Sequence, residues 1–582
     1  MKRILKKSIV SIVSIVSMVS IASVSCSDDH FDVNPDVSSQ QTLWQNIKSN
    51  PDLSEFAAIL EQVYVSKSEG VSTTQTYADL FSNEQIFTVW APKNGNIDAY
   101  IKLLSYDNAD STYRVEKELI QNQMVRYNHV LNRETADTLD LFNDKQTVFD
   151  QKNKTFGDCL IEKWNIGCSN GTLHIVNGSA VYTHNLYEYL GTNHELDSIY
   201  NFFKSFEKIE FNESASTQGP TINGNITWVD SVTYVNNQIF WSLGATLNSE
   251  DSLYAMILPT NKAWDTALKE TKTFYNYLNT YTQKVPLDED NDTTITTELT
   301  QEEIDSMLNL YSKTAICNNL VFNARYQYRP FDVDNPANCD SIKSTAGTVF
   351  YQPYLTNIFA QARPAVRMSN GYAYITDNFG YRARDTWAKD EEIVARMNAN
   401  IDKVEKGTSS NGSSYFYRND STINFSYAKI EPMNSSVQPA VTYKLRNVLS
   451  CKYDIFVVMA YNTNAMLPTL FKVMLTDQKN KNGKQLVPLD ADTLHNGGNK
   501  LFKNIPHFNP DPLYSDLTMY HDTIQLAEDY LFENCYYGLD YAYPTIKITT
   551  NVTNKDKSNY TKEMWIDRII LVAKGNDLNG ED

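Results

Sequence analysis

Hydrophobic and polar residues alternate in short runs along the chain. The first clear run, Gln-Ile-Phe-Thr-Val-Trp-Ala-Pro-Lys-Asn, lies at residues 85–94. An alternating run that stops at proline predicts a strand, and the stretch after it has the spacing of a helix. A similar run, Leu-Tyr-Ala-Met-Ile-Leu-Pro-Thr-Asn-Lys, occupies residues 253–262, and residues 43–59 have helical apolar spacing. The pattern therefore predicts a strand-turn-helix unit that occurs twice.

A second motif recurs later in each copy. Residues 169–178 read Ser-Asn-Gly-Thr-Leu-His-Ile-Val-Asn-Gly, and residues 369–377 read Ser-Asn-Gly-Tyr-Ala-Tyr-Ile-Thr-Asp. Asn-Gly favours a tight turn that leads into an alternating strand. Two motifs in the same order indicate duplicated domains. We predict that the apolar positions of both copies are core: Phe87, Val89, Leu173, Ile175, Tyr254, Met256, Tyr372 and Tyr374.

From about Asp385 the pattern changes to short strands separated by Asn, Gly, Ser and Lys. Four runs either alternate or are wholly apolar: residues 441–445, 452–460, 545–549 and 565–572. Short strands with regular turn signals predict an all-β sandwich.

The repeated motifs resemble the fasciclin domain, which has a Phe-Thr-Val-Phe-Ala-Pro-Thr-Asn type of strand-turn-helix motif and a late Asn-Gly strand. The resemblance implies α+β fasciclin-like domains in tandem, at residues 41–192 and 193–382. Residues 124–130 occupy the place of the family's Tyr-His adhesion motif, but Asn128 replaces the tyrosine, and residues 316–322 contain no histidine. The final segment, residues 383–582, resembles the jelly-roll, galactose-binding-like modules that accompany carbohydrate enzymes.

The N-terminus has four basic residues within residues 2–7, then an Ile/Val/Ser run, then small residues before Cys26. This pattern predicts a secretory signal over residues 1–25; an uncleaved anchor helix is the alternative. It resembles the lipobox of bacterial lipoproteins, with Ser23 where leucine is more common, which implies a lipid on Cys26 and a lipidated linker over residues 26–40. Residues 27–29 resemble the acidic export signal of Bacteroidota-type lipoproteins. That resemblance implies an outer-membrane, lipid-anchored protein facing the cell exterior, with periplasmic retention as the alternative.

Charge and cysteine content narrow the possible partners. The formal net charge is −19, so the phosphate backbone of a nucleic acid would be repelled and we predict no nucleic-acid partner. Six cysteines remain after Cys26, and they either form three bridges, 159 with 168, 317 with 339 and 451 with 535, or stay unpaired. No Cys-x-x-Cys occurs, which argues against a zinc knuckle or a redox dithiol.

Metal-binding and catalytic motifs are weak. Asp288, Asp290 and Asp292 have the spacing of a calcium loop, but Thr293 and Leu299 stand where that loop needs Gly and Glu. We therefore predict a solvated acidic loop at residues 285–299, no metal and no cofactor. The sequence has no Gly-x-Ser-x-Gly elbow, His-Glu-x-x-His helix or phosphate loop, so we predict a protein that is not an enzyme.

Two aromatic clusters flanked by polar residues are candidate glycan-binding platforms: Tyr415 with Tyr417, and Tyr536 with Tyr537. Asp-Ser and Asp-Thr pairs followed by a small or apolar residue recur, as at Asp110, and resemble the O-glycosylation acceptor of Bacteroidota-type envelope proteins. Together the resemblances imply adhesion or glycan capture, with the chain as an accessory subunit of a SusC/SusD-type outer-membrane glycan importer. The alternative is protein-protein adhesion or an envelope scaffold with no glycan ligand.

Overall fold

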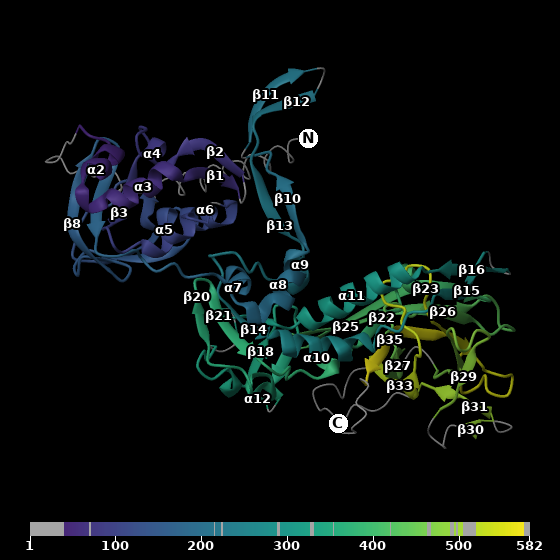
Figure 1. Cartoon of the computed structure of the whole chain (residues 1–582). Coiled ribbons are helices and arrows are strands. Elements are labelled where there is room, and N and C mark those ends of the chain that lie inside the picture. Colours follow the sequence, from purple (N-terminus) through teal and green to yellow (C-terminus); the bar gives the residue numbers. More distant parts are fainter. Residues whose placement is uncertain are drawn as a thin grey trace, which may run out of the picture.

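A computed structural model describes residues 40–574 except 69–70, 107, 215, 223–224, 288–290, 326, 328–330, 353, 419–420, 463–466, 489–493, 496–498 and 505–518. The chain mixes helices with a larger number of strands, arranged in several sheets. Figure 1 shows three parts along the chain, which we call the first unit (residues 42–180), the second unit (185–388) and the sandwich (391–574). None of the helices in the described ranges is both long and apolar enough to cross a membrane. Cys26 and the predicted signal lie outside the described residues.

The first unit is built on a sheet with strand order β4-β3-β9-β8-β7-β6-β5. Strand β3 runs parallel to β9, and the other neighbours are antiparallel. Its strands are β3 (Phe87–Pro92), β4 (Met124–Arg126), β5 (Ala136–Asp140), β6 (Gln146–Asp150), β7 (Thr155–Phe156), β8 (Cys159–Cys168) and β9 (Gly171–Val176). Around it lie α2 (Leu43–Ser49), α3 (Ser54–Gln62), α4 (Tyr77–Leu80), α5 (Asp98–Leu104), α6 (Ala109–Val115) and the hairpin of β1 (Tyr64–Ser68) and β2 (Val71–Thr76).

The second unit repeats the centre of that sheet in the order β17-β14-β21-β20. Again the first strand is parallel to the late one and antiparallel to a short third one. The strands are β14 (Tyr254–Pro259), β17 (Val321–Asn323), β20 (Val366–Met368) and β21 (Gly371–Thr376), with the small hairpin of β18 (Ser341–Lys343) and β19 (Val349–Tyr351). The helices are α7 (Leu186–Thr192), α8 (Asp197–Lys204), α9 (Ile239–Leu243), α10 (Asn261–Lys272), α11 (Gln301–Cys317), α12 (Tyr354–Phe359) and α13 (Ala383–Thr386).

The predicted core positions are confirmed by their burial. Phe87, Val89, Leu173, Ile175, Tyr254, Met256 and Tyr374 are each at most 8% exposed. Tyr372 is only partly buried and packs against the core, with the Arg367 guanidinium 4.7 Å from its ring centroid. The central strands of both units therefore bury the predicted positions, and they bury the residues between them as well, so both faces of these strands are covered.

Each Asn-Gly motif fastens its unit in the same way. In the first unit the Asn170 amide accepts a hydrogen bond from the Leu43 N–H (2.7 Å) and donates to the carbonyls of Phe81 and Asn83. In the second, Asn370 accepts from the Leu186 N–H (2.9 Å) and donates to the carbonyls of Leu247 and Ser249. Each asparagine thus accepts a hydrogen bond from the first N–H of the first helix of its unit, and it also holds the loop that leads into β3 or β14. The Asn-Gly pattern predicts a turn but not these contacts.

A long arm projects from the start of the second unit (Figure 1). It consists of two antiparallel pairs, β10 (Glu207–Phe211) with β13 (Thr233–Asn237) and β11 (Thr217–Ile222) with β12 (Asn225–Asp230). Ile209 lies opposite Val235, and their side chains are 74% and 36% exposed. The arm therefore presents apolar side chains to solvent.

The sandwich consists of two antiparallel sheets that share one hydrophobic core. One sheet has the order β24-β25-β35-β27-β33, with β22 also beside β35; the other has the order β23-β26-β34-β28-β29, with β32 also beside β28. The first contains β22 (Glu391–Val394), β24 (Gly407–Arg418), β25 (Ser421–Pro432), β27 (Lys452–Asn462), β33 (Met519–Leu531) and β35 (Met564–Ala573). The second contains β23 (Ile401–Glu405), β26 (Ala440–Lys444), β28 (Leu470–Thr476), β29 (Lys484–Leu486), β32 (Phe502–Lys503) and β34 (Thr545–Thr550), and a short separate pair is formed by β30 (Leu494–His495) and β31 (Asn499–Lys500).

The core of the second unit continues without a break into the sandwich. At the junction the Tyr281 hydroxyl donates to the Cys535 carbonyl (2.6 Å), and the Tyr277 hydroxyl donates to the Tyr537 carbonyl (2.8 Å). The first unit has hydrophobic clusters of its own. The second unit and the sandwich therefore pack as one body, whereas the exact domain boundaries stay a prediction.

A buried histidine in the first unit gives a prediction for stability against pH. His174 is fully buried and stacks on Trp90; its Nε2 lies 2.9 Å from the His129 carbonyl, and its Nδ1 accepts from the Asn165 N–H. Both ring nitrogens are thus satisfied only in the neutral form, and burial lowers the pKa of His174 to about 4. In the unfolded chain this imidazole takes up a proton near pH 6.5. The contribution of His174 to the free energy of unfolding is therefore complete above that pH and is lost as the pH falls towards 4.

We expect the free energy of unfolding to be about 2 kcal/mol lower at pH 5 than at pH 7 on account of His174. Urea unfolding at both pH values measures it, with His174→Gln expected to flatten this part of the pH dependence. His194→Gln is the control, because that side chain is 94% exposed. A pH dependence equal in wild type and His174→Gln would show that the histidine does not contribute.

Candidate functional site

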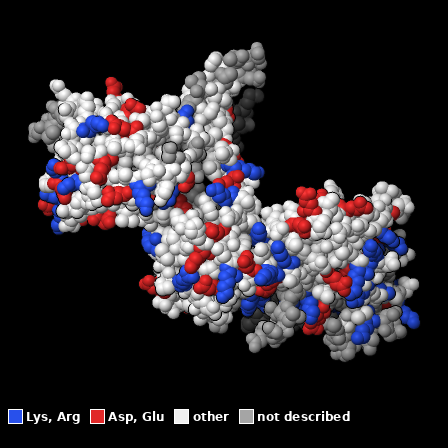
Figure 2. All heavy atoms as spheres, viewed as in Figure 1, with Lys and Arg blue, Asp and Glu red and all other residues white. Residues whose placement is uncertain are grey.

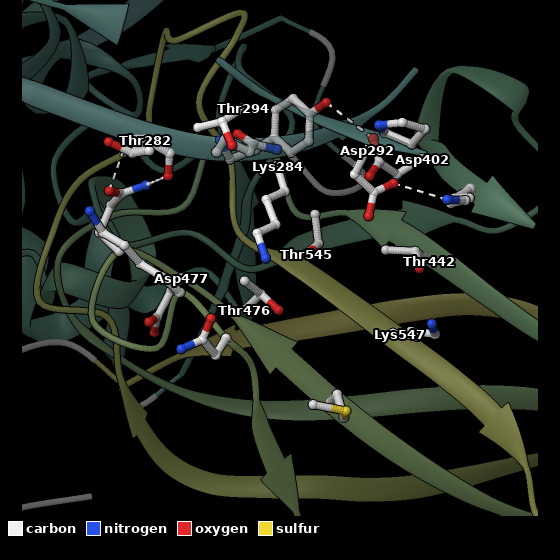
Figure 3. Close-up of a pocket in the computed structure, with 18 of the residues that line it drawn as sticks. Thr282, Lys284, Asp292, Thr294, Asp402, Thr442, Thr476, Asp477, Thr545 and Lys547 are labelled. Carbon is white, nitrogen blue, oxygen red and sulfur yellow. Dashed lines mark hydrogen bonds and ion pairs between the residues drawn. The ribbon is translucent and has the colours of Figure 1, made fainter. Parts of the chain in front are cut away.

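A cleft in the second unit and sandwich lies between a hairpin and a sheet. The hairpin pairs β15 (Thr280–Pro286) with β16 (Asp292–Glu298) in continuous register. It belongs to the second unit, and it lies over the outer face of the β23-β26-β34-β28 part of the sandwich (Figure 3). The cavity between them has a volume of about 390 Å³, within the range of about 300–1,000 Å³ that is usual for ligand sites.

The hairpin corrects one sequence prediction. Residues 285–299 were expected to be a solvated acidic loop, but most of them are strand. The run Thr293-Thr294-Ile295-Thr296-Thr297 is rich in β-branched residues, which favour extended backbone more strongly than the neighbouring aspartates disfavour it. Asp288 and Asp290 lie outside the described residues, and Asp292 pairs with Lys403 at 2.9 Å.

The floor of the cleft is the polar face of alternating strands. Along β34, Ile546 and Ile548 are buried in the sandwich core, so Thr545 and Lys547 point to the opposite face. The same alternation places Thr442 and Thr476 at the cleft, together with Met474. Hydroxyl groups thus line the floor, beside Thr282 and Thr294 of the hairpin (Figure 3).

The carboxylates of the cleft all have protein partners. Asp402 accepts from the Tyr543 hydroxyl (3.2 Å) and lies 3.8 Å from the Lys444 ammonium. Burial raises the pKa of Asp402, and these two neighbours act in the opposite direction. Glu405 pairs with Lys547.

Asp477, at the end of β28, accepts hydrogen bonds from the Tyr530 hydroxyl (2.7 Å) and the Asn480 N–H (2.6 Å). With Asp292 bound to Lys403, every carboxylate lining the cleft is paired or hydrogen-bonded.

One hydrogen-bond donor of the cleft is left over. Lys284 extends from β15 into the cavity towards Thr476 and Thr545 (Figure 3). Within the described ranges its ammonium forms neither an ion pair nor a hydrogen bond with a side chain. The neighbouring Gln283 lies on the opposite face of β15, where its amide accepts from the Tyr543 N–H and its Nε2 is fully enclosed. The cleft therefore offers a free ammonium beside a row of hydroxyls.

Among the described residues, Tyr543 is the one aromatic side chain that borders the cleft. The Lys444 ammonium and the Arg446 guanidinium lie 5.4 and 5.6 Å from its ring centroid. Burial, with help from Asp402, raises its pKa to about 12. Figure 2 shows many basic side chains over the sandwich with acidic ones among them, and the two signs of charge are also mixed over the first unit.

The structure places Tyr536 and Tyr537 away from the cleft. Tyr536 is 2% exposed, and its hydroxyl oxygen accepts from the Gln478 N–H, so it is a core residue and presents no exposed face. Tyr537 is partly buried against Tyr311 and Tyr275. Tyr415 and Tyr417 lie in β24, paired with Asn424 and Thr422, but their side chains are outside the described residues.

Other sequence alternatives are also resolved. All six cysteines after Cys26 are free thiols, so the unpaired alternative is the one observed. Among the Asp-Ser and Asp-Thr pairs, Ser111 is buried, which contradicts a surface sugar there, whereas Thr138 and Thr266 are exposed. Within the described residues no group of three or more His, Cys, Asp or Glu side chains is placed to hold a metal ion.

The cleft was missed from the sequence because its parts are far apart. Lys284, Asp402, Asp477 and Tyr543 come from four segments that only the packing of the hairpin on the sandwich brings together. The available signal was the alternation of β34, in which polar residues occupy every second position of a buried strand.

Comparison with known proteins gives no family. No family model matches the chain, and no curated protein matches it. Among solved structures, a FAS1 domain pair from the insect cell adhesion molecule Fasciclin I aligns with 52% of this chain and 90% of its own, at 11% identity and a TM-score of 0.21. A structure of carbohydrate-binding modules of the β-sandwich superfamily aligns with 63% of this chain and 96% of its own, at 8% identity and a TM-score of 0.15. A Paenibacillus xanthan lyase aligns with 36% of this chain and 16% of its own, at 12% identity and a TM-score of 0.19. At such TM-scores these likenesses establish neither a shared fold nor a shared function.

Proposed function

We propose that the chain is a non-catalytic cell-surface protein that captures a glycan in the cleft between the β15–β16 hairpin and the sandwich. The observation that carries the proposal is the unpartnered Lys284 ammonium beside the threonines of the sheet. Sugar hydroxyls both donate and accept hydrogen bonds, so one sugar can satisfy the lysine and the threonines together. Tyr543 adds an aromatic edge at the same cavity.

The finer features of this proposal come from the sequence resemblances. In it, the first two units are a fasciclin-like pair and the sandwich is a jelly-roll module; the repeated parallel strand pair and the shared Asn-Gly fastening support the pair. The protein is anchored in the outer membrane by a lipid on Cys26, faces the cell exterior, and carries O-linked sugars at exposed Asp-Thr sites. It serves a SusC/SusD-type importer as an accessory subunit.

Binding of polysaccharides to the chain tests the proposal. Affinity electrophoresis of residues 27–582 against a panel of neutral and uronate-containing polysaccharides should give at least one retarded migration. Lys284→Ala should weaken that binding about 10-fold, because it removes a charge-assisted hydrogen bond of about 1.5 kcal/mol. Lys208→Ala is the matched control, since Lys208 is an exposed lysine on a strand of the arm. Retention that is equal in Lys284→Ala and wild type would move the ligand out of the cleft.

A second candidate function is protein-protein adhesion without a glycan, and the arm favours it. Ile209, Val235 and Phe211 lie on one face of the β10–β13 pair and are all partly or largely exposed. Exposed apolar side chains on a projecting hairpin suit contact with a protein surface. If no polysaccharide is retained, and a purified SusC/SusD-type importer binds wild type but not Ile209→Ser, this candidate replaces glycan capture.

A further inference from the structure

A second pocket lies where the second unit meets the sandwich, and we call it the junction pocket. Its volume is about 260 Å³. The side chains that matter below come from four segments: Tyr311 of α11, Tyr275 after α10, Tyr537 after β33, and the segment that leads into β22 with Lys389 and Glu391. None of these residues contributes to the cleft under the β15–β16 hairpin.

The pocket holds an acidic and a basic side chain that are not bound to each other. Glu391 and Lys389 are both partly buried and both line the pocket. Each affects the titration of the other, yet in the described chain neither forms an ion pair within 4 Å or a hydrogen bond through its side chain. Burial raises the pKa of Glu391 to about 7 and lowers that of Lys389. A buried charge without a partner is unfavourable, so both groups are suited to a ligand that brings the opposite charge.

Three tyrosine rings form another part of the wall, beside polar residues such as Asn318 and Asn447. Tyr311 and Tyr537 pack edge to face with centroids 5.0 Å apart, and Tyr275 contacts both of them. Tyrosine rings attract cations over their faces. Glu391 lines the same pocket as these rings, which favour an ammonium group.

We propose that the junction pocket binds a small zwitterion of the α-amino acid type. The ammonium of the ligand pairs with Glu391 beside the tyrosine rings, and its carboxylate pairs with the Lys389 ammonium. A neutral sugar would form hydrogen bonds but would compensate neither the charge of Lys389 nor that of Glu391. A ligand with a single charge would compensate only one of the two. The inference does not rest on glycan capture, because it uses none of the residues of the cleft.

Isothermal titration calorimetry of residues 27–582 with glycine and L-alanine tests this inference. We expect saturable binding, weakened at least about 10-fold by Glu391→Gln and by Lys389→Met. Glu391→Gln keeps the shape of the side chain and removes a partly buried charge, so its thermal unfolding should match that of wild type or exceed it. Lys284→Ala should leave amino-acid binding unchanged.

Three outcomes would overturn the inference. The first is no heat of binding at about 10 mM of either amino acid. The second is binding of glycine that persists in Glu391→Gln and Lys389→Met. The third is binding of glucose with loss in the same two variants, which would assign the pocket to a neutral sugar instead. None of these results depends on whether polysaccharides bind the cleft, so failure here and failure of glycan capture are distinguishable.

Discussion

Replacing Gly371 by alanine is expected to prevent stable folding of the second unit. A Cβ at this position would lie 2.1 Å from the Tyr254 carbonyl oxygen and within 3.0 Å of the Tyr254 backbone nitrogen. Both atoms belong to β14, which pairs with β21 over six consecutive residues, so the strand cannot move away without breaking that ladder. We expect a loss of more than about 4 kcal/mol, in the range of the most severe single substitutions.

Thermal unfolding and limited proteolysis of the purified variant measure this effect. Gly347→Ala is the matched control, because Gly347 also lies in the second unit, at φ +99°, but has open space around its Cβ position. That variant should cost only about 1 kcal/mol of backbone strain. Gly171→Ala should damage the first unit similarly, since its Cβ would lie 1.9 Å from the Phe87 carbonyl oxygen. A Gly371→Ala protein as stable as Gly347→Ala would refute the close-approach argument.

The duplication was readable from the sequence because it rests on local pattern. The strands of both units alternate, and the two Asn-Gly motifs mark the starts of β9 and β21. What the Asn side chains do was not readable, since Asn370 bonds to residues 123 and 184 positions away. The glycine requirement has the same origin: it comes from a parallel strand that is distant in sequence, and not from the turn.

The candidate site was less predictable than the fold. Tyrosines flanked by polar residues suggested exposed platforms, but Tyr536 is buried at the junction, where a large ring with one hydroxyl fits an apolar contact that needs one hydrogen bond. Aspartates near residue 290 suggested a loop, whereas the β-branched threonines beside them form a strand. Composition thus indicated the residue types of a polar site, but tertiary packing decided which of them face a cavity.

Replacing Lys145 by methionine is expected to destabilise the contact between the first and second units. The Lys145 side chain is only 5% exposed, and its ammonium lies 2.7 Å from Glu188 Oε2, 2.6 Å from Glu250 Oε1 and 3.1 Å from Ser369 Oγ. Burial alone would raise the pKa of Glu188, but Lys145 and nearby hydrogen bonds hold it below its ordinary value. Without the lysine, two acidic groups remain together, partly buried and uncompensated, which costs about 3–5 kcal/mol.

Urea unfolding at pH 7 measures the loss, and small-angle scattering reports whether the two units separate. The control is Lys93→Met, which breaks the half-exposed Lys93–Glu162 pair and should cost less than about 1 kcal/mol. Adding Glu250→Gln to Lys145→Met should restore part of the stability, because it removes one of the two uncompensated charges. Acid should have the same effect: as the pH falls and Glu188 and Glu250 become protonated, the deficit of Lys145→Met relative to wild type should shrink. A deficit that is independent of both the second substitution and pH would assign the role of Lys145 to packing rather than to charge.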